Sequence, residues 1–100
     1  MSLTGKQVRQ LRALVHHLNP SINIGKSDIT DSLIKQADEY LEAHELIKCS
    51  VQDGSNLDVH EAADLLAREL NADVVQVIGR RFALYRETHR GDVEKITLTV

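Results

Sequence analysis

The chain has 100 residues, enough for one hydrophobic core, so we expect a single domain. Its hydrophobic fraction of 42% is that of a globular protein, and no apolar stretch approaches the roughly 20 residues of a membrane-spanning helix. The lone cysteine, Cys49, excludes an internal disulfide, and the N-terminal residues lack the apolar core of a secretory signal, so we expect a cytoplasmic protein.

The net charge of −3 conceals a segregation of charge along the chain. Residues 1–26 carry four cations and no acid, residues 27–78 carry 12 acids and three cations, and residues 79–91 carry four arginines and one glutamate. Salt limits the reach of a surface charge to about 8–10 Å, so a partner responds to the local charge. A basic surface forms if the first and third segments meet in the fold. Otherwise the charges are scattered, and composition does not choose between these alternatives.

The first predicted helix begins at Thr4, because Thr4 and Gln7 have the spacing of a capping box. Apolar residues then recur at helical spacing from Val8 to Leu18, and the cations fall largely outside that stripe. The helix should end at Asn19-Pro20, because proline disfavours a helical conformation in the residue before it.

The rest of the chain alternates between strands and helices. A strand over residues 21–24, a helix over 30–44 and a strand over 46–51 precede a third helix that starts near Asn56 or Asp58. A hairpin over 74–86 turns at Gly79-Arg80, where a glycine in the first central position favours a type II′ turn. Residues 87–100 are either a loose tail or contain a late strand through Ile96, Leu98 and Val100.

The element order is therefore α-β-α-β-α-β-β. Two crossover helices between strands predict an α/β fold in one compact domain. Its mixed four-stranded sheet would contain parallel pairs and one antiparallel pair, with three helices packed on it.

The segment INIGKSDIT, residues 22–30, passes from strand to helix through a turn that could bind a phosphate. Gly25 has no side chain to keep a phosphate away, and Lys26 supplies a positive charge. The helix that follows directs its free N–H groups and its positive dipole end towards the turn. The second glycine and the Lys-Ser/Thr pair of a Walker loop are missing. The alternative is a purely structural turn.

Catalytic patterns are weak. HEAAD at residues 60–64 resembles the helical zinc-protease motif, but Asp64 stands where the second histidine belongs. Cys49 lies in an apolar run and is predicted to be a buried strand residue. We therefore expect no enzyme activity, no catalytic or metal-binding residues and no cofactor.

Four segments together resemble the CRM (chloroplast RNA splicing and ribosome maturation) domain of the YhbY family over residues 3 to about 86. They are LTGKQVRQLRALVHHLNP, INIGKSDIT, HELIKCSV and VQVIGRRFALYR. The resemblance implies a fold similar to the C-terminal domain of translation initiation factor three. It also implies a GxxG loop that approaches RNA backbone as in KH domains. In bacterial members it implies association with precursors of the large ribosomal subunit.

Gly25, Lys26 and Ser27 match the first three positions of the GxxG loop, but Asp28 replaces the second glycine. Aspartate brings a Cβ and a negative charge close to the presumed phosphate. It can also cap the second helix, with Asp31 three residues later. The resemblance assigns residues 1–90 to the RNA-binding domain and leaves 91–100 as a tail or late strand.

The resulting hypothesis is a non-enzymatic, monomeric bacterial protein that binds ribosomal RNA during large-subunit assembly, with no membrane or small-molecule partner. The expected RNA-binding residues are Gly25, Lys26, Ser27, Lys6, Arg9, Arg12, Arg80, Arg81 and Arg86. The hypothesis requires the first helix, the loop and the hairpin to share a face. The alternative is a protein-interaction module whose acidic helices bind a basic ribosomal protein or assembly factor.

Overall fold

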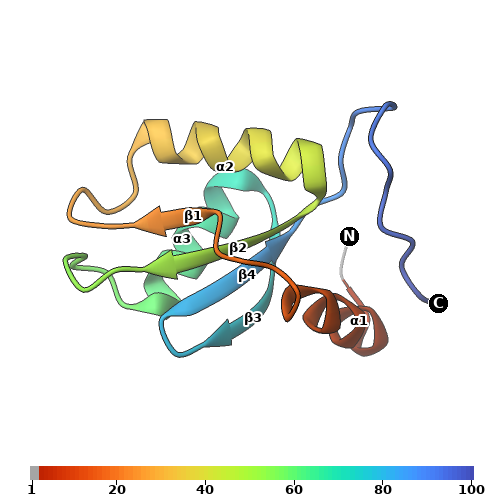
Figure 1. Cartoon of the computed structure of the whole chain (residues 1–100), viewed down its shortest axis with the longest axis horizontal. Helices are drawn as coiled ribbons and strands as arrows, with labels where there is room; N and C mark the ends of the chain where they lie inside the picture. Colours follow the sequence, from red (N-terminus) through yellow and green to blue (C-terminus); the bar gives the residue numbers. More distant parts are fainter. Residues whose placement is uncertain (1–2) are drawn as a thin grey trace.

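A four-stranded sheet in the order β1-β2-β4-β3 organises the chain (Figure 1). The computed structural model describes residues 3–100, and within that range it contains three helices and four strands in the predicted order. They are α1 (Gly5–Val15), β1 (Ile22–Ile24), α2 (Asp31–His44), β2 (Leu46–Val51), α3 (Val59–Leu70), β3 (Asp73–Ile78) and β4 (Arg81–Tyr85). The predicted α/β fold with a mixed sheet is confirmed.

The pairing of the strands differs from the prediction in one respect. β1 pairs with β2 in parallel, whereas β4 is antiparallel to both of its neighbours, β2 and β3. The expectation of parallel pairs and one antiparallel pair was therefore wrong. The reason is that the hairpin folds β4 back along the side of β3 that faces β2, so that β4 separates two strands that would otherwise be parallel neighbours.

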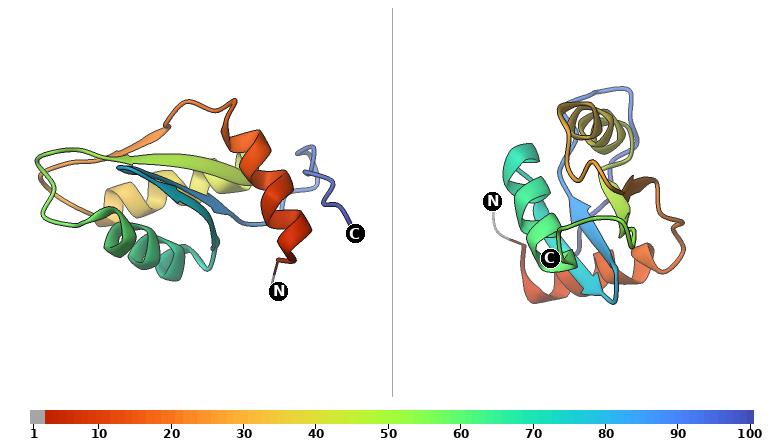
Figure 2. Two further views of the ribbon diagram at one scale, coloured as in Figure 1. Left: turned by 90° about the horizontal axis from the view of Figure 1, so that it is seen from below. Right: turned by 90° about the vertical axis from the view of Figure 1, so that its left-hand side faces the viewer.

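Each face of the sheet has its own hydrophobic core. α2 and α3 cover one face, where Ile47 and Cys49 of β2 and Phe82 and Leu84 of β4 are buried. α1 covers part of the other face and packs on alternate residues of the same strands (Figure 2, left). The prediction of a buried Cys49 is confirmed, and burial raises the pKa of its thiol to about 12, so the thiolate that would be reactive does not form at neutral pH.

Local capping signals set the helix starts as predicted. Thr4 and Gln7 form the capping box of α1, and Asp58 with Glu61 forms that of α3. α1 ends at Val15, earlier than predicted. The N–H of His16 still bonds to the carbonyl of Arg12, four residues back, but those of His17 and Leu18 bond three residues back, which tightens the last turn before Pro20 is reached.

The β3–β4 turn also has the predicted geometry. Gly79 has φ +59 and Arg80 has no positive φ, as a type II′ turn requires. In the part of the chain that the structure describes, no helix is long and apolar enough to cross a membrane.

Residues 87–100 form a packed tail without strand structure. They run back alongside α1, where the side-chain amide of Gln10 donates to the carbonyl of Thr97 over 2.7 Å. The fully buried carboxylate of Glu45 fixes this tail: it accepts hydrogen bonds from the backbone N–H groups of Thr88 (2.8 Å) and Ile96 (2.6 Å). A residue of the α2–β2 junction thus attaches the C-terminal segment to the domain.

Replacing Glu45 with alanine should destabilise the fold. The variant leaves two backbone donors without an acceptor, and each costs about 1–3 kcal/mol where it stays shielded from water. Alanine at the left-handed φ of +65 is no less strained than glutamate, so the change isolates the carboxylate. Urea unfolding should show a loss of at least about 1 kcal/mol. Glu39→Ala, an exposed change on α2, is the matched control, and an equal effect in both variants would refute this role of Glu45.

Candidate nucleic-acid interface

The segment from Gly25 to Asp28 is a tight turn whose fourth residue carries the unusual backbone conformation. The N–H of Asp28 donates to the carbonyl of Gly25 over 2.9 Å, and Asp28 has φ +53. That left-handed value occurs at the position where the family resemblance implies a second glycine, and aspartate is among the few other residues that adopt it readily. Gly25 has no positive φ, and a Cβ built on it meets no atom within 4 Å. Its bare backbone faces open space.

The Asp28 carboxylate bonds to the neighbouring β2–α3 loop. Its Oδ1 accepts hydrogen bonds from the Ser55 hydroxyl (2.6 Å) and from the backbone N–H of Asn56 (2.9 Å). The Ser55 hydroxyl, and then the Asn56 N–H, lower the pKa of Asp28 below its ordinary range. The prediction that Asp28 caps α2 was wrong: Thr30 caps that helix, with its hydroxyl accepting from the N–H of Leu33 over 3.1 Å.

The same β2–α3 loop supports Lys26. A Cβ on Gly54 would lie 2.9 Å from Cγ of Lys26, so the lysine stem crosses the bare backbone of that glycine. The charged end of Lys26 is left exposed beside Ser27, which is also exposed. Among residues 3–100, the backbone N–H groups of Lys26 and Ser27 have no hydrogen-bond acceptor. The turn therefore offers one cation and two free donors.

The β3–β4 turn joins this end of the sheet. The backbone N–H of Val51 donates to the carbonyl of Arg80 over 2.8 Å, and the Arg80 guanidinium pairs with Asp53 of the β2–α3 loop. Both side chains of this ion pair are largely exposed, so it is weak and leaves Arg80 accessible to another anion. Three loops thus lie together at one end of the sheet (Figure 1).

The cations of α1 lie away from these loops. Figures 1 and 2 place α1 at the opposite end of the sheet. Lys6 and Arg9 are exposed there, and Nε of Arg12 donates to the carbonyl of Val75 in β3 over 2.9 Å. The predicted residues therefore form two groups, one on α1 and one around the loops, and not one continuous cluster.

Arg86 belongs to neither group. Its side chain is only 13% exposed, and it forms ion pairs with Asp38 (2.8 Å) and Glu42 (2.9 Å) of α2 while donating to the carbonyl of Leu70. These contacts hold the Arg86 side chain against α2 and the end of α3, the two helices that cover one face of the sheet. Sequence patterns gave no sign of this network, because its carboxylates lie 44 and 48 residues away along the chain.

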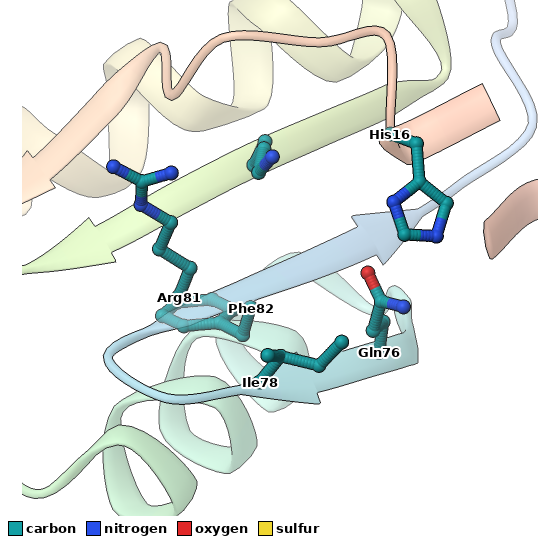
Figure 3. Close-up of a pocket in the computed structure, with 6 residues that line it drawn as sticks. His16, Gln76, Ile78, Arg81 and Phe82 are labelled. Atoms are coloured by element: carbon teal, nitrogen blue, oxygen red, sulfur yellow. The ribbon is translucent and has the colours of Figure 1, made fainter. Parts of the chain in front are cut away.

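A hollow on the sheet lies between the two groups of cations. It has a volume of about 180 Å³ and is lined by His16, Lys48, Gln76, Ile78, Arg81 and Phe82 (Figure 3). Arg81 is the one lining residue that the sequence hypothesis included. The others were missed, although the alternation of β2 already placed Lys48 on the face opposite to Cys49.

The hydrogen bonds of the Asp28 carboxylate to Ser55 and Asn56 predict that the stability of the fold depends on pH. Because the folded state lowers the pKa of Asp28, its ionised carboxylate stabilises the fold above the unfolded value of about 3.9, and this contribution is lost as pH falls through the folded pKa. Asp28→Asn tolerates the left-handed φ but removes the charge. Wild type should be the more stable protein at neutral pH, with the difference shrinking in acid. In the Ser55→Ala variant, NMR titration should show a higher pKa of Asp28 than in wild type. An unchanged pKa would contradict a stabilising hydrogen bond between Ser55 and the Asp28 carboxylate.

Comparisons with known proteins agree with this architecture. The chain is similar to a Bacillus subtilis protein named probable RNA-binding protein YqeI, with 44% identity over 86 residues, which cover 86% of this chain and 90% of that protein. It is 31% identical to a Haemophilus influenzae protein named RNA-binding protein, over 93% of this chain and 94% of the relative.

A solved structure has the same fold. The solution structure of the hypothetical protein SAV1595 from Staphylococcus aureus superposes with a TM-score of 0.75 at 41% identity, covering 95% of this chain and all of the other. The CRS1 / YhbY (CRM) domain matches residues 3–86, which include every helix and strand described above. The chain belongs to the CRS1/YhbY (CRM) domain family.

Proposed function

We propose that this protein binds RNA through the Gly25–Asp28 turn, which contacts the phosphate backbone. The observation that carries the proposal is the empty space at Gly25: no side chain or backbone atom occupies the position where a Cβ would lie. The exposed cation of Lys26 and the two free N–H groups beside it are donors of the kind that phosphate oxygens accept. The relatives named as RNA-binding proteins support this assignment.

Asp28 is compatible with such a role. Its carboxylate is bonded to the β2–α3 loop, so its negative charge is partly offset by the Ser55 and Asn56 donors and does not compete for Lys26. The N-terminus of α2 contributes less than the sequence suggested, because Thr30 caps it and Asp31 stands in its first turn. Phosphate affinity in this proposal comes from the turn itself.

The finer assignment is ribosomal RNA during large-subunit assembly, bound by a cytoplasmic monomer. It rests on the family resemblance, to which the basic residues of α1 and the hairpin add charge. Arg80, Arg81, Lys6, Arg9 and Arg12 are exposed and supply secondary phosphate contacts, whereas Arg86 acts within the fold. The rival function, an acidic protein-binding surface, is weakened because Asp38 and Glu42 are paired with Arg86 inside the chain.

Gly25→Ala should separate RNA binding from folding. The new Cβ meets no protein atom and the backbone is not left-handed, so the stability should stay within about 0.5 kcal/mol of wild type. The methyl group should nevertheless hold a phosphate away from the turn and weaken binding of fluorescent large-subunit ribosomal RNA fragments several-fold. Gly91→Ala, which is equally unhindered but lies in the tail, is the control. Equal affinity in the two variants would argue for a structural turn.

Lys26→Glu tests the electrostatic part of the proposal. The logarithm of the wild-type binding constant should fall linearly with the logarithm of salt concentration, and loss of one phosphate contact should reduce the magnitude of that slope by about 0.7 on single strands. Lys35→Glu makes the same change of charge at an exposed position of α2, outside the turn. If both variants weaken binding equally, only net charge matters and the turn has no special role.

A further inference from the structure

The hollow on the sheet face, lined by residues of β2, β3 and β4 and by His16, lies outside the proposed phosphate-binding turn. α1 covers only one end of this face, so the strands between α1 and the β3–β4 turn stay open (Figure 2, left). We propose that this hollow holds the base of one unpaired nucleotide in a single RNA strand. The proposal rests on the RNA binding proposed above and adds a second kind of contact, to a base, which the phosphate-binding turn does not provide.

The lining of the hollow has the charge that an RNA strand requires. It contains Lys48 and Arg81, with His16 at the end nearest α1, and no carboxylate. Arg81 is exposed, and among residues 3–100 it forms no ion pair, unlike its neighbour Arg80. Nζ of Lys48 donates to the carbonyl of Leu18 over 3.2 Å, which leaves other ammonium protons available for a phosphate.

The floor of the hollow has the chemistry that a base requires. Ile78 is 60% exposed although it lies in a strand, and it stands directly opposite Arg81 across the β3–β4 pair. Figure 3 shows the Ile78 and Gln76 side chains projecting from β3, with the Gln76 amide directed towards the His16 ring. An apolar surface can support the flat face of a base, an imidazole ring can stack on it, and an amide offers both a donor and an acceptor to its edge.

The size of the hollow restricts the ligand. A volume of about 180 Å³ lies below the roughly 300–1,000 Å³ of sites for drug-sized ligands and cofactors, so one base fits better than a larger molecule. Bases in an RNA duplex are paired and stacked, and only unpaired bases can turn outward into such a site. Cations on α1 and around the loops flank the hollow on both sides, so the strand can continue in either direction. The geometry therefore favours single-stranded over duplex RNA.

The first test compares two apolar truncations on the same strand. Ile78→Ala should weaken binding of fluorescent 12-nucleotide oligo(U) and oligo(A) about three- to tenfold, with an unchanged salt slope, and should leave binding of an RNA duplex unaltered. Val74→Ala is the control, because Val74 is also exposed but pairs opposite Leu84 and does not line the hollow. Equal affinities of the two variants for single strands would overturn the proposal.

The second test separates this proposal from the proposed function. Mononucleotides (AMP, CMP, GMP and UMP) and inorganic phosphate are titrated into the ¹⁵N-labelled full chain. Mononucleotides, but not phosphate, should shift the amide signals of Gln76, Ile78 and Arg81. The same shifts with phosphate alone would show an anion site without base recognition and would overturn the proposal, as would the absence of shifts. If wild type binds no RNA, the proposed function fails, yet the mononucleotide result still decides whether the hollow takes a base.

Discussion

Strand β4 is the element on which the two cores depend. It lies between β2 and β3, so its backbone N–H and C=O groups face another strand on both sides. Its side chains alternate between the two faces of the sheet. Phe82 and Leu84 pack under α2 and α3, whereas Ala83 and Tyr85 pack under α1. Removing β4 would leave β3 without a neighbour and would split both cores. The hairpin turn that positions β4 therefore contributes to both cores.

This arrangement also explains why part of the sheet remains open. Two helices, α2 and α3, cover one face along the sheet, whereas α1 alone lies on the other face and crosses it at one end. Among the uncovered strand positions, Lys48, Gln76 and Arg81 stand in place of apolar residues that the alternation would otherwise bury, whereas Ile78 is apolar and exposed. An open face with polar and cationic side chains is stable in water, and it is also the surface on which an extended polyanion can lie.

Local sequence signals predicted the helices and strands well, whereas the strand order and the ion pairs depend on long-range contacts and could not be predicted. The capping boxes at Thr4 and Asp58 and the glycine of the β3–β4 turn act within a few residues, so sequence spacing was enough to identify them. The insertion of β4 between β2 and β3 depends on which strand edges meet, and no local pattern encodes that. The same holds for Arg86, whose basic side chain indicates an RNA contact in the sequence but pairs in the fold with carboxylates that are distant along the chain.

Asp28 shows how one residue can meet two requirements that glycine meets only in part. The turn needs a left-handed φ at this position, and both glycine and aspartate can provide it. Only aspartate also reaches Ser55 and Asn56, and so connects the β1–α2 loop to the loop that carries Gly54 under the Lys26 stem. Judged by charge alone, aspartate at this position is unfavourable for phosphate binding. Its carboxylate, however, bonds to the β2–α3 loop and not to the turn. These hydrogen bonds also restrict the motion of that loop, against which the Lys26 stem lies. In the proposed interface, that restriction lowers the entropy lost when Lys26 and the free N–H groups meet a phosphate, because the loops are already held together.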